Sequence, residues 1–414
     1  MKGAAAGWVR GRMRALAFAA VLALGCDAVS AADWELDLDA RLVSSDAQRS
    51  LRDGGSGELR FGEGQSGLQL GRVRFAVSQN IGEVWSLHLD ASDWGDHDPH
   101  PIGLTEGYLR FRPYPFDGVR IRVKAGAFYA PISLENRESG WESPYTLSYS
   151  AIDTWISEEL RTIGLETQLE WLGTRAGHGF DIALTGAVFG WNDPAGVVLA
   201  DRGFTLHDRQ TTLFGRVGRP GSPVGSFELF REDDGRAGVY AGIEARYLDR
   251  VVVRALHYDN RADPSAFDTG TQEFAWLTRF NSAGVRAESV TGWTAIAQWL
   301  KGETFVEPAG TRFGFPFEAK FLLVSRAVGR HRLSARYDEF EVLTDFGADT
   351  QAQQGHAWTL AYVFEPDAHW RLTLEWLRVT TDSSLRQQLF ATARLATENK
   401  VEAAFRYALG SAVR

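Results

Sequence analysis

Basic residues recur at every second position in three short stretches of the chain. They are Arg72 and Arg74, Arg110 and Arg112, and Arg120, Arg122 and Lys124. A period of two places all members of a stretch on one face of a β-strand. Guanidinium groups bind phosphate and carboxylate through paired hydrogen bonds, and rings of Arg or Lys are one way in which a pore favours anions. These residues are our candidate anion-binding residues along a polar wall.

Carboxylates on the same inner face give the basic rows a second explanation. By the phase of the alternation, the inward acidic residues are Glu35, Asp37, Asp39, Asp90, Glu106, Glu166, Glu170 and Asp338. Pairs of opposite charge would hold the shape of a lumen with weak selectivity, whereas a basic excess would favour anions. The sequence leaves both explanations open and favours either of them over a preference for cations.

Other groups with chemical potential form weaker patterns. Residues 93–100 combine aspartates with histidines but lack the ligand spacing of a calcium loop, so we expect a solvated outer loop and no metal site. Ser86 and His88 share one strand face, a pairing that arises often by chance. The chain has neither a Gly-x-Ser-x-Gly elbow nor a phosphate-cradling glycine loop. We therefore expect no enzyme and no cofactor.

The elements that must position these groups alternate apolar and polar residues along nearly the whole chain. Residues 370–376 alternate strictly between two tryptophans. In a membrane barrel one face of such a strand meets lipid and the other a polar lumen. Tryptophans fall near many expected strand ends, as interfacial girdles do: Trp34, Trp85, Trp171, Trp191, Trp293, Trp370 and Trp376. We predict an all-β fold, a transmembrane antiparallel β-barrel.

The alternating segments number about 18, which would place both termini on the periplasmic side. Short and long connections alternate between them, as in outer-membrane barrels. Residues 211–218, 224–232 and 237–248 are expected as wall strands, but the pattern between 209 and 248 is the weakest, so 16 strands remain an alternative.

The N-terminus has the form of a secretory signal peptide. Four basic residues precede the apolar run 15–25, and Val29-Ser30-Ala31 resembles a cleavage site. We predict a removed signal peptide over 1–31 and a single barrel domain over 32–414; lipidation of Cys26, the only cysteine, is the alternative. The formal net charge of −9 argues against a nucleic-acid partner.

The longest polar interruption of the pattern, residues 126–164, holds several aromatic residues and should be packed. Its ends, with Gly126-Ala127-Phe128, Pro131 and Glu135 at the start and Arg161 with Gly164 at the finish, resemble the phosphate-selective porins O and P. Segments 258–260 and 336–338 are also similar to that family.

The resemblance implies an outer-membrane channel, usually a trimer with about 16 strands per subunit, in which a long loop folds inward and basic residues line an anion path. On this basis residues 128–160 are the expected constriction loop. The candidate residues of this loop are Glu135, Arg137, Glu142 and Arg161.

Our leading hypothesis is a passive porin in the outer membrane of a Gram-negative bacterium, a water-filled channel for small hydrophilic solutes with a preference for phosphate-like anions. Its expected partners are outer-membrane lipid, lipopolysaccharide, the solutes, and further copies of the chain in a homotrimer. The alternatives are a plugged barrel that serves as a surface receptor, adhesin or structural protein, and a secreted soluble β-rich domain.

Overall fold

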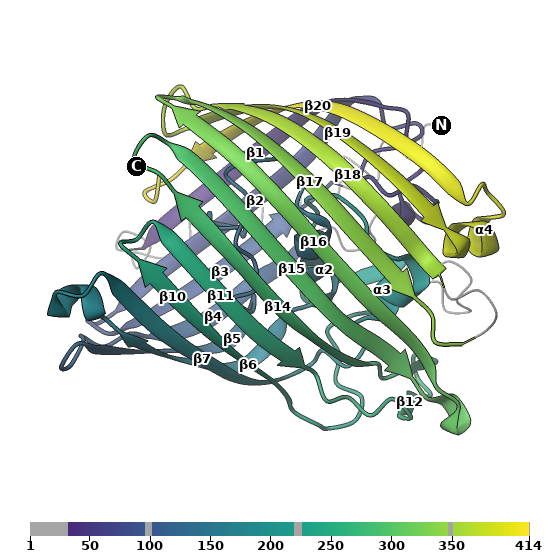
Figure 1. The fold of residues 1–414 in the computed structure, drawn as a ribbon, viewed down its shortest axis with the longest axis horizontal. Coiled ribbons are helices and arrows are strands. Elements are labelled where there is room, and N and C mark those ends of the chain that lie inside the picture. The colour runs from purple at the N-terminus through teal and green to yellow at the C-terminus, as the bar shows by residue number, and fades with distance from the viewer. Residues whose placement is uncertain (1–31, 96–101, 219–225, 347–350, 414) are drawn as a thin grey trace.

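Sixteen antiparallel strands close into one barrel in the computed structural model, which describes residues 32–95, 102–218, 226–346 and 351–413 (Figure 1). Each strand pairs with the next in the ring, and the first pairs with the last, with Leu36 opposite Leu409. The prediction of a transmembrane β-barrel is confirmed, with 16 strands as the correct count. The predicted signal peptide, residues 1–31, lies outside the described residues.

The wall strands follow one another in chain order. They are β1 (Asp33–Ser45), β2 (Gly67–Ile81), β3 (Trp85–Asp93), β4 (Ile102–Phe111), β5 (Val119–Phe128), β6 (Thr162–Trp171), β7 (Phe180–Gly190), β10 (Gly238–Tyr247), β11 (Val251–Asp259), β14 (Leu277–Glu288), β15 (Trp293–Val306), β16 (Phe313–Val328), β17 (His331–Leu343), β18 (Gln351–Phe364), β19 (Trp370–Ser383) and β20 (Leu395–Leu409).

The start of β1, the end of β20 and the short turns lie at one end of the barrel, which in outer-membrane barrels faces the periplasm. We call it the periplasmic end and the opposite one the outer end. Short periplasmic turns alternate with longer outer connections, as the sequence predicts. Strands β15 to β20 run for 13 to 16 residues, whereas the wall strands β3 to β7, β10 and β11 run for 9 to 11, so one side of the wall is taller.

The prediction of wall strands at 211–218 and 224–232 is wrong. Among the residues described there, only β8 (Arg216–Gly218) and β9 (Ser226–Glu228) form strands, and they make a separate two-stranded sheet, as do β12 (Phe267–Asp268) and β13 (Glu273–Phe274). The apolar side chains of Leu213, Val217 and Leu229 are buried in the core cluster instead of facing lipid. Apolar alternation in this stretch thus reflects packing inside the barrel.

The outer face of the wall is apolar and exposed. Leu165, Leu184, Leu322 and Leu360 are each about half exposed, at 51%, 54%, 53% and 47%. Aromatic side chains such as Trp293 and Trp370, at 51% and 43% exposed, stand near the periplasmic end of their strands. Such a belt suits contact with the hydrocarbon and its interfaces.

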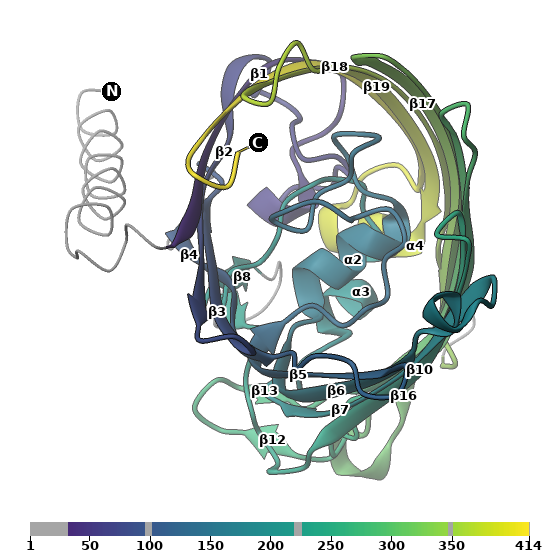
Figure 2. The same cartoon turned by 90° about the vertical axis from the view of Figure 1, so that its left-hand side faces the viewer.

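Three connections fill much of the interior: residues 46–66, 129–161 and 191–215. Their helices lie within the ring of strands (Figure 2): α2 (Ala151–Glu159), in which every residue is buried, and α3 (Val197–Arg202). The other helical pieces are α4 (Ser384–Phe390), η2 (Leu51–Asp53), η3 (Gly173–Ala176) and η4 (Pro308–Gly310). Within the described ranges, no helix is both long enough and apolar enough to cross a membrane.

Candidate pore and its inserted loop

The loop between β5 and β6, residues 129–161, leaves the wall at its outer end and turns into the lumen. Ser150 caps α2, with its Oγ accepting a hydrogen bond from the Asp153 N–H at 3.2 Å. The Ser150 N–H donates to Glu135 Oε1 at 2.6 Å, and Ser133 Oγ donates to Asp153 Oδ2 at 2.8 Å. Glu135, which was predicted as a loop residue, therefore joins the first part of the loop to the start of α2.

Burial is the main influence on the carboxyl groups at this junction. It raises the pKa of Asp153 well above the usual range, and the neighbouring charge of Glu135 raises it further. Burial also raises the pKa of Glu135, against the lowering effect of Arg336. Both shifts favour the protonated form of the carboxyl group.

Side chains from the taller wall hold the main chain of the loop. Arg336 on β17 donates to the carbonyl oxygens of Ser148 and Tyr149 at 2.7 and 2.8 Å and to Asp338 Oδ2 at 2.8 Å. Asp338 Oδ1 accepts from the Ala151 N–H at 3.1 Å. On β19, Glu375 accepts from the N–H groups of Leu147 at 2.7 Å and Ser148 at 3.1 Å. These wall residues fix the loop at mid-height in the lumen.

Helix α2 packs through Trp155 against the wall. Its ring lies 4.9 Å from that of Phe317 and 5.4 Å from that of Phe280, centroid to centroid. Glu159 at the end of α2 accepts hydrogen bonds from the N–H groups of Gly196, Val198 and Leu199, at the start of α3, and from Trp155 Nε1. One carboxylate thus joins the two internal helices.

The third internal segment crosses beside the loop and meets buried arginines. Asp208 accepts hydrogen bonds from Arg41 of β1 and from Arg60, the latter at 3.0 Å. Burial alone would raise the pKa of Asp208, but the charges of Arg41 and Arg60 hold it far below its usual range. His207 Nδ1 accepts from the Arg209 N–H at 3.1 Å, which leaves Nε2 to donate to Glu158 at 3.0 Å.

The predicted basic residues divide into two groups. Arg72 and Arg74 of β2 are buried at the tip of the loop: Arg72 pairs with Glu142, and Arg74 bonds Asp90, Asp37 and Glu35 at 2.7, 2.8 and 3.0 Å. Gly140 adopts a positive φ of 71° beside Arg74, and a side chain there would collide with the guanidinium. For these two arginines the geometry matches the shape-holding explanation.

The second group lies toward the periplasmic end and is more open. Side chains of Arg122 and Lys124 are 30% and 29% exposed, and they pair with Glu170 at 2.6 Å and Glu166 at 3.0 Å. Glu170 also pairs with Arg120 at 3.4 Å and Arg246 at 2.6 Å, so one carboxylate serves three arginines. Arg110 donates to Ser86 Oγ at 3.1 Å, and Arg112 stands in the turn that follows β4.

The remaining predicted loop residues occupy different places. Arg137 is part-exposed and pairs with Glu288 of β14, while Glu142 lies between Arg72 and Arg406. Arg161 is fully buried, with its guanidinium carbon 3.4 Å from the centre of the Tyr129 ring. Burial lowers the pKa of Arg161 to about 9. Arg161 thus lies at the base of the loop, away from Arg137 and Glu142 at its tip.

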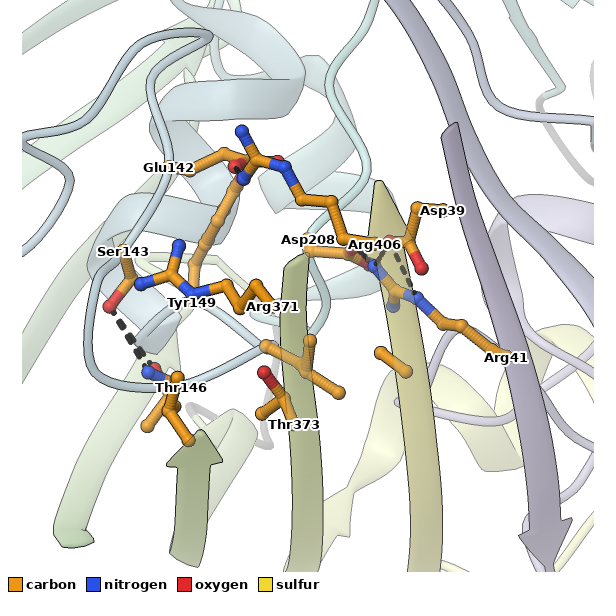
Figure 3. A pocket seen from close by; sticks show the side chains of 13 residues that line it. Asp39, Arg41, Glu142, Ser143, Thr146, Tyr149, Asp208, Arg371, Thr373 and Arg406 are labelled. Atoms are coloured by element: carbon orange, nitrogen blue, oxygen red, sulfur yellow. Dashed lines mark hydrogen bonds and ion pairs between the residues drawn. The ribbon is translucent and has the colours of Figure 1, made fainter. Parts of the chain in front are cut away.

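A cavity of about 30 Å³ lies between the loop and the wall made by β18, β19, β20 and β1 (Figure 3). It holds roughly two water molecules. Its charged lining is Asp39, Arg41, Glu142, Asp208, Arg371 and Arg406. A hydrated ion does not fit this cavity.

Three of the lining residues, Arg41, Arg371 and Arg406, were not among the predicted site residues. Each lies in inward phase on its strand, as Thr373 does beside Arg371. The signal was therefore the same alternation that identified the basic rows, applied to β1, β19 and β20. The alternation does not show that these three arginines lie close to the loop.

Ser86 and His88, which share a strand face, each bond a different partner. His88 Nδ1 lies 2.8 Å from Ser78 Oγ, whereas Ser86 accepts from Arg110. Within the described part of the chain, Asp193, Glu232 and Asp234 bring carboxylate oxygens within 4.8 Å of one another; Asp193 is buried and the other two are half-buried. Most of the 93–100 cluster lies outside the described residues.

No protein-family model and no curated protein matches the sequence. Among solved structures, the outer membrane channel DcaP of Acinetobacter baumannii is similar at a TM-score of 0.53 and 10% identity, over 91% of this chain and 97% of that one. A loop L8 deletion mutant of OmpT, an outer membrane protein of Vibrio cholerae, has a TM-score of 0.50 and 11% identity, over 91% of this chain and 99% of that one. A mutant of the Rh. blastica porin covers 91% of this chain and 99% of its own, at a TM-score of 0.39 and 10% identity. The first two likenesses show the fold, an outer-membrane β-barrel of the porin type.

Proposed function

We propose that the chain forms an outer-membrane channel through which small hydrophilic solutes diffuse passively, with a preference for anions. The observation that carries this proposal is the open basic wall below the loop, where Glu170 serves three arginines and Arg122 and Lys124 remain about 30% exposed. A basic excess along a wet wall attracts anions and repels cations. The similarity to the outer membrane channel DcaP supports a channel role.

Reversal potentials in planar bilayers under a salt gradient test the selectivity. We expect the wild-type channel to favour chloride over potassium, and the double variant Arg122→Ala/Lys124→Ala to lose most of that preference. Lys301→Ala is the matched control, because Lys301 pairs with Glu318 on the outer face of the wall and should leave selectivity unchanged. Clear cation selectivity of the wild-type channel would contradict the anion preference.

A plugged barrel that acts as a receptor or structural protein is the second candidate, and the packing inside the barrel favours it. Trp155, Phe204, Phe280 and Phe317 form one apolar cluster within the ring of strands, in the half nearer the outer end. Correctly folded protein that shows no conductance over long recordings would support this candidate and contradict the channel.

The location and the partners are part of the same proposal: the outer membrane of a Gram-negative bacterium, a homotrimer, and contact with lipopolysaccharide. The taller wall carries outward ion pairs above its apolar belt, Lys301 with Glu318 at 2.7 Å and Lys320 with Glu339 at 3.0 Å. Such lysines stand where lipid phosphates would lie. Native mass spectrometry of protein extracted in mild detergent measures the oligomeric state and the bound lipopolysaccharide. Monomers free of lipopolysaccharide would contradict the homotrimer and the lipid contact.

A further inference from the structure

We infer that the outside of the taller wall contains a binding site for one anionic glycerophospholipid of the periplasmic leaflet, built by an apolar groove with Arg326 at its end. The inference rests on the proposed outer-membrane location, and it concerns the lipid-facing surface instead of the lumen. One acyl chain of the lipid lies in the groove, and the charged headgroup meets Arg326.

The groove crosses strands β15 to β20, which are consecutive neighbours in the ring (Figure 1). It lies on their outward side, in the periplasmic half of the wall, and has a volume of about 640 Å³. Its outward-facing lining is Trp293, Val324, Arg326, Leu333, Ala335, Leu360, Tyr362, Leu374, Trp376 and Val401. All of these side chains except Arg326 are apolar or aromatic, as contact with hydrocarbon requires.

Strand pairing explains the shape of the groove. Ala335 of β17 stands opposite Val324 of β16 and Leu360 of β18, so a short side chain lies between two longer ones and forms the floor. From Trp293 on β15 to Trp376 on β19 the groove crosses four strand spacings, about 19 Å in all. The acyl chains of one leaflet occupy about 15 Å, half of the hydrocarbon core. One chain of a phospholipid therefore fits along the groove.

Arg326 gives the groove a positive charge that no side chain neutralises among the described residues. Its guanidinium carbon lies 5.1 Å from the centre of the Trp293 ring, and its Nη1 is buried without a hydrogen-bond partner. Other basic residues on the outside of the wall are paired: Arg279, Lys301 and Lys320 each contact a carboxylate. An unpaired charge beside hydrocarbon is unfavourable, and an anionic headgroup removes that cost.

The position of Arg326 along its strand places the headgroup at the periplasmic interface. Strand β16 ends two residues later, at Val328, and Trp293 is the first residue of β15. In the same region, His331 Nδ1 lies 2.7 Å from the Tyr362 hydroxyl. Tryptophan and tyrosine are enriched at the level of lipid headgroups. The leaflet on this side consists of glycerophospholipids, whose phosphate oxygens match the paired donors of a guanidinium.

Charge complementarity favours a lipid over a second copy of the chain as the occupant. A second copy would have to present a carboxylate to Arg326 from its own outer face. Outward carboxylates of the taller wall, such as Glu318 and Glu339, already pair with lysines in the outer half of their strands. An anionic lipid reaches Arg326 directly from the bilayer.

Native mass spectrometry of the full chain, refolded in neutral detergent and titrated with phosphatidylglycerol or phosphatidylethanolamine, tests the site. We expect one phosphatidylglycerol per chain, bound at least fivefold more tightly than zwitterionic phosphatidylethanolamine. Arg326→Gln should weaken the binding of phosphatidylglycerol at least fivefold. Arg279→Gln is the matched control, because it removes the same charge from the outside of the wall at its opposite end. Heat-modified mobility on gels verifies that each variant folds.

A second variant tests the groove independently of the charge. Ala335→Phe fills the floor of the groove with an apolar side chain that the lipid-facing surface tolerates. We expect it to weaken the binding of both lipids at least fivefold, because both place an acyl chain there. Unchanged affinity of this variant for phosphatidylglycerol would contradict the groove as the binding site.

Equal affinity of Arg326→Gln and wild type for phosphatidylglycerol, or equal affinity of the wild type for the two lipids, overturns the inference. Oligomers that retain no lipid and that Ala335→Phe dissociates also overturn it, and they assign the groove to a second copy. Planar-bilayer recordings separate the lipid site from the channel. Lipid retention without conductance supports the site and contradicts the proposed function, whereas conductance without lipid retention does the reverse.

Discussion

Replacing Arg336 with alanine should loosen the inserted loop from the wall. Arg336 is fully buried, and its guanidinium bonds the carbonyl oxygens of Ser148 and Tyr149 as well as Asp338. Glu135 Oε2 lies 3.4 Å from the same guanidinium. The substitution leaves two carboxylates buried without their cation and two carbonyl groups without their donor.

The size of the effect follows from the burial of these groups. Removing one partner of a buried ion pair costs about 3–5 kcal/mol, and an unsatisfied buried carbonyl adds about 1–3 kcal/mol. The two costs overlap, because the loop can move to rehydrate the groups, so we take about 4 kcal/mol for the docked state. At about 1.4 kcal/mol per tenfold change, the docking equilibrium shifts by roughly a thousandfold.

Hydrogen exchange measures the docking directly. In the docked loop the amides of Leu147 and Ser148 are held by Glu375 and that of Ala151 by Asp338, and these amides should exchange faster in the Arg336→Ala variant. Single-channel recordings should show larger and noisier conductance, because the cavity beside the loop tip widens. Arg279→Ala is the control: the Arg279 side chain is 51% exposed and pairs with Glu303 on the outer face, where such a pair contributes about 0–1 kcal/mol.

Unchanged exchange and conductance in the Arg336→Ala variant would refute this reasoning about the loop. A variant that fails to fold, as judged by heat-modified mobility, is replaced by Glu375→Gln. That change keeps the size of the side chain but weakens its hold on Leu147 and Ser148. It should therefore give a smaller effect in the same direction.

Three further substitutions probe other parts of the barrel. Glu159→Ala leaves three α3 N–H groups without their acceptor, at about 1–3 kcal/mol for each group that water cannot reach, and limited proteolysis should then cut within 191–215 faster. Burial raises the pKa of Asp208, but the charges of Arg41 and Arg60 lower it by more. The charged carboxylate therefore stabilises the fold above the ordinary pKa of about 4, and this stabilisation is lost only in stronger acid. Asp208→Asn should lower the melting temperature at neutral pH and reduce the dependence of the melting temperature on acid. Leu360→Lys places a charge on the lipid face and should weaken folding into vesicles by about 2–4 kcal/mol relative to Leu360→Ala, as measured by urea titration.

The wall of the barrel was predictable because its signal is local. Along β19, Leu374 faces outward at 53% exposed while Thr373 and Glu375 face inward and are buried, as the alternation requires. Lipid on one side and water on the other impose this pattern on each strand separately. The sequence therefore determined which face each side chain occupies without knowledge of its neighbours.

The interior was less predictable because its contacts join distant parts of the chain. Residues 191–215 carry apolar and polar side chains without a clear period, and they fold inside the barrel where both kinds find partners. Arg74 and Arg122 have the same sequence pattern, yet Arg74 is fully buried among three carboxylates and Arg122 is part-exposed. The difference arises from the loop tip, which covers β2 and leaves the periplasmic half of β5 open.

Placement of the loop tip implies that two properties of the channel have separate origins. We expect conductance to depend on contacts that hold the loop, which come from β17 and β19 through Arg336 and Glu375. We expect selectivity to depend on Arg122 and Lys124, which share no hydrogen bond or ion pair with those contacts among the described residues. Substitutions in the two groups should therefore combine additively, since distant sites without common partners rarely couple. A double variant whose selectivity changes beyond the sum of its parts would mean that the loop tip itself belongs to the anion path.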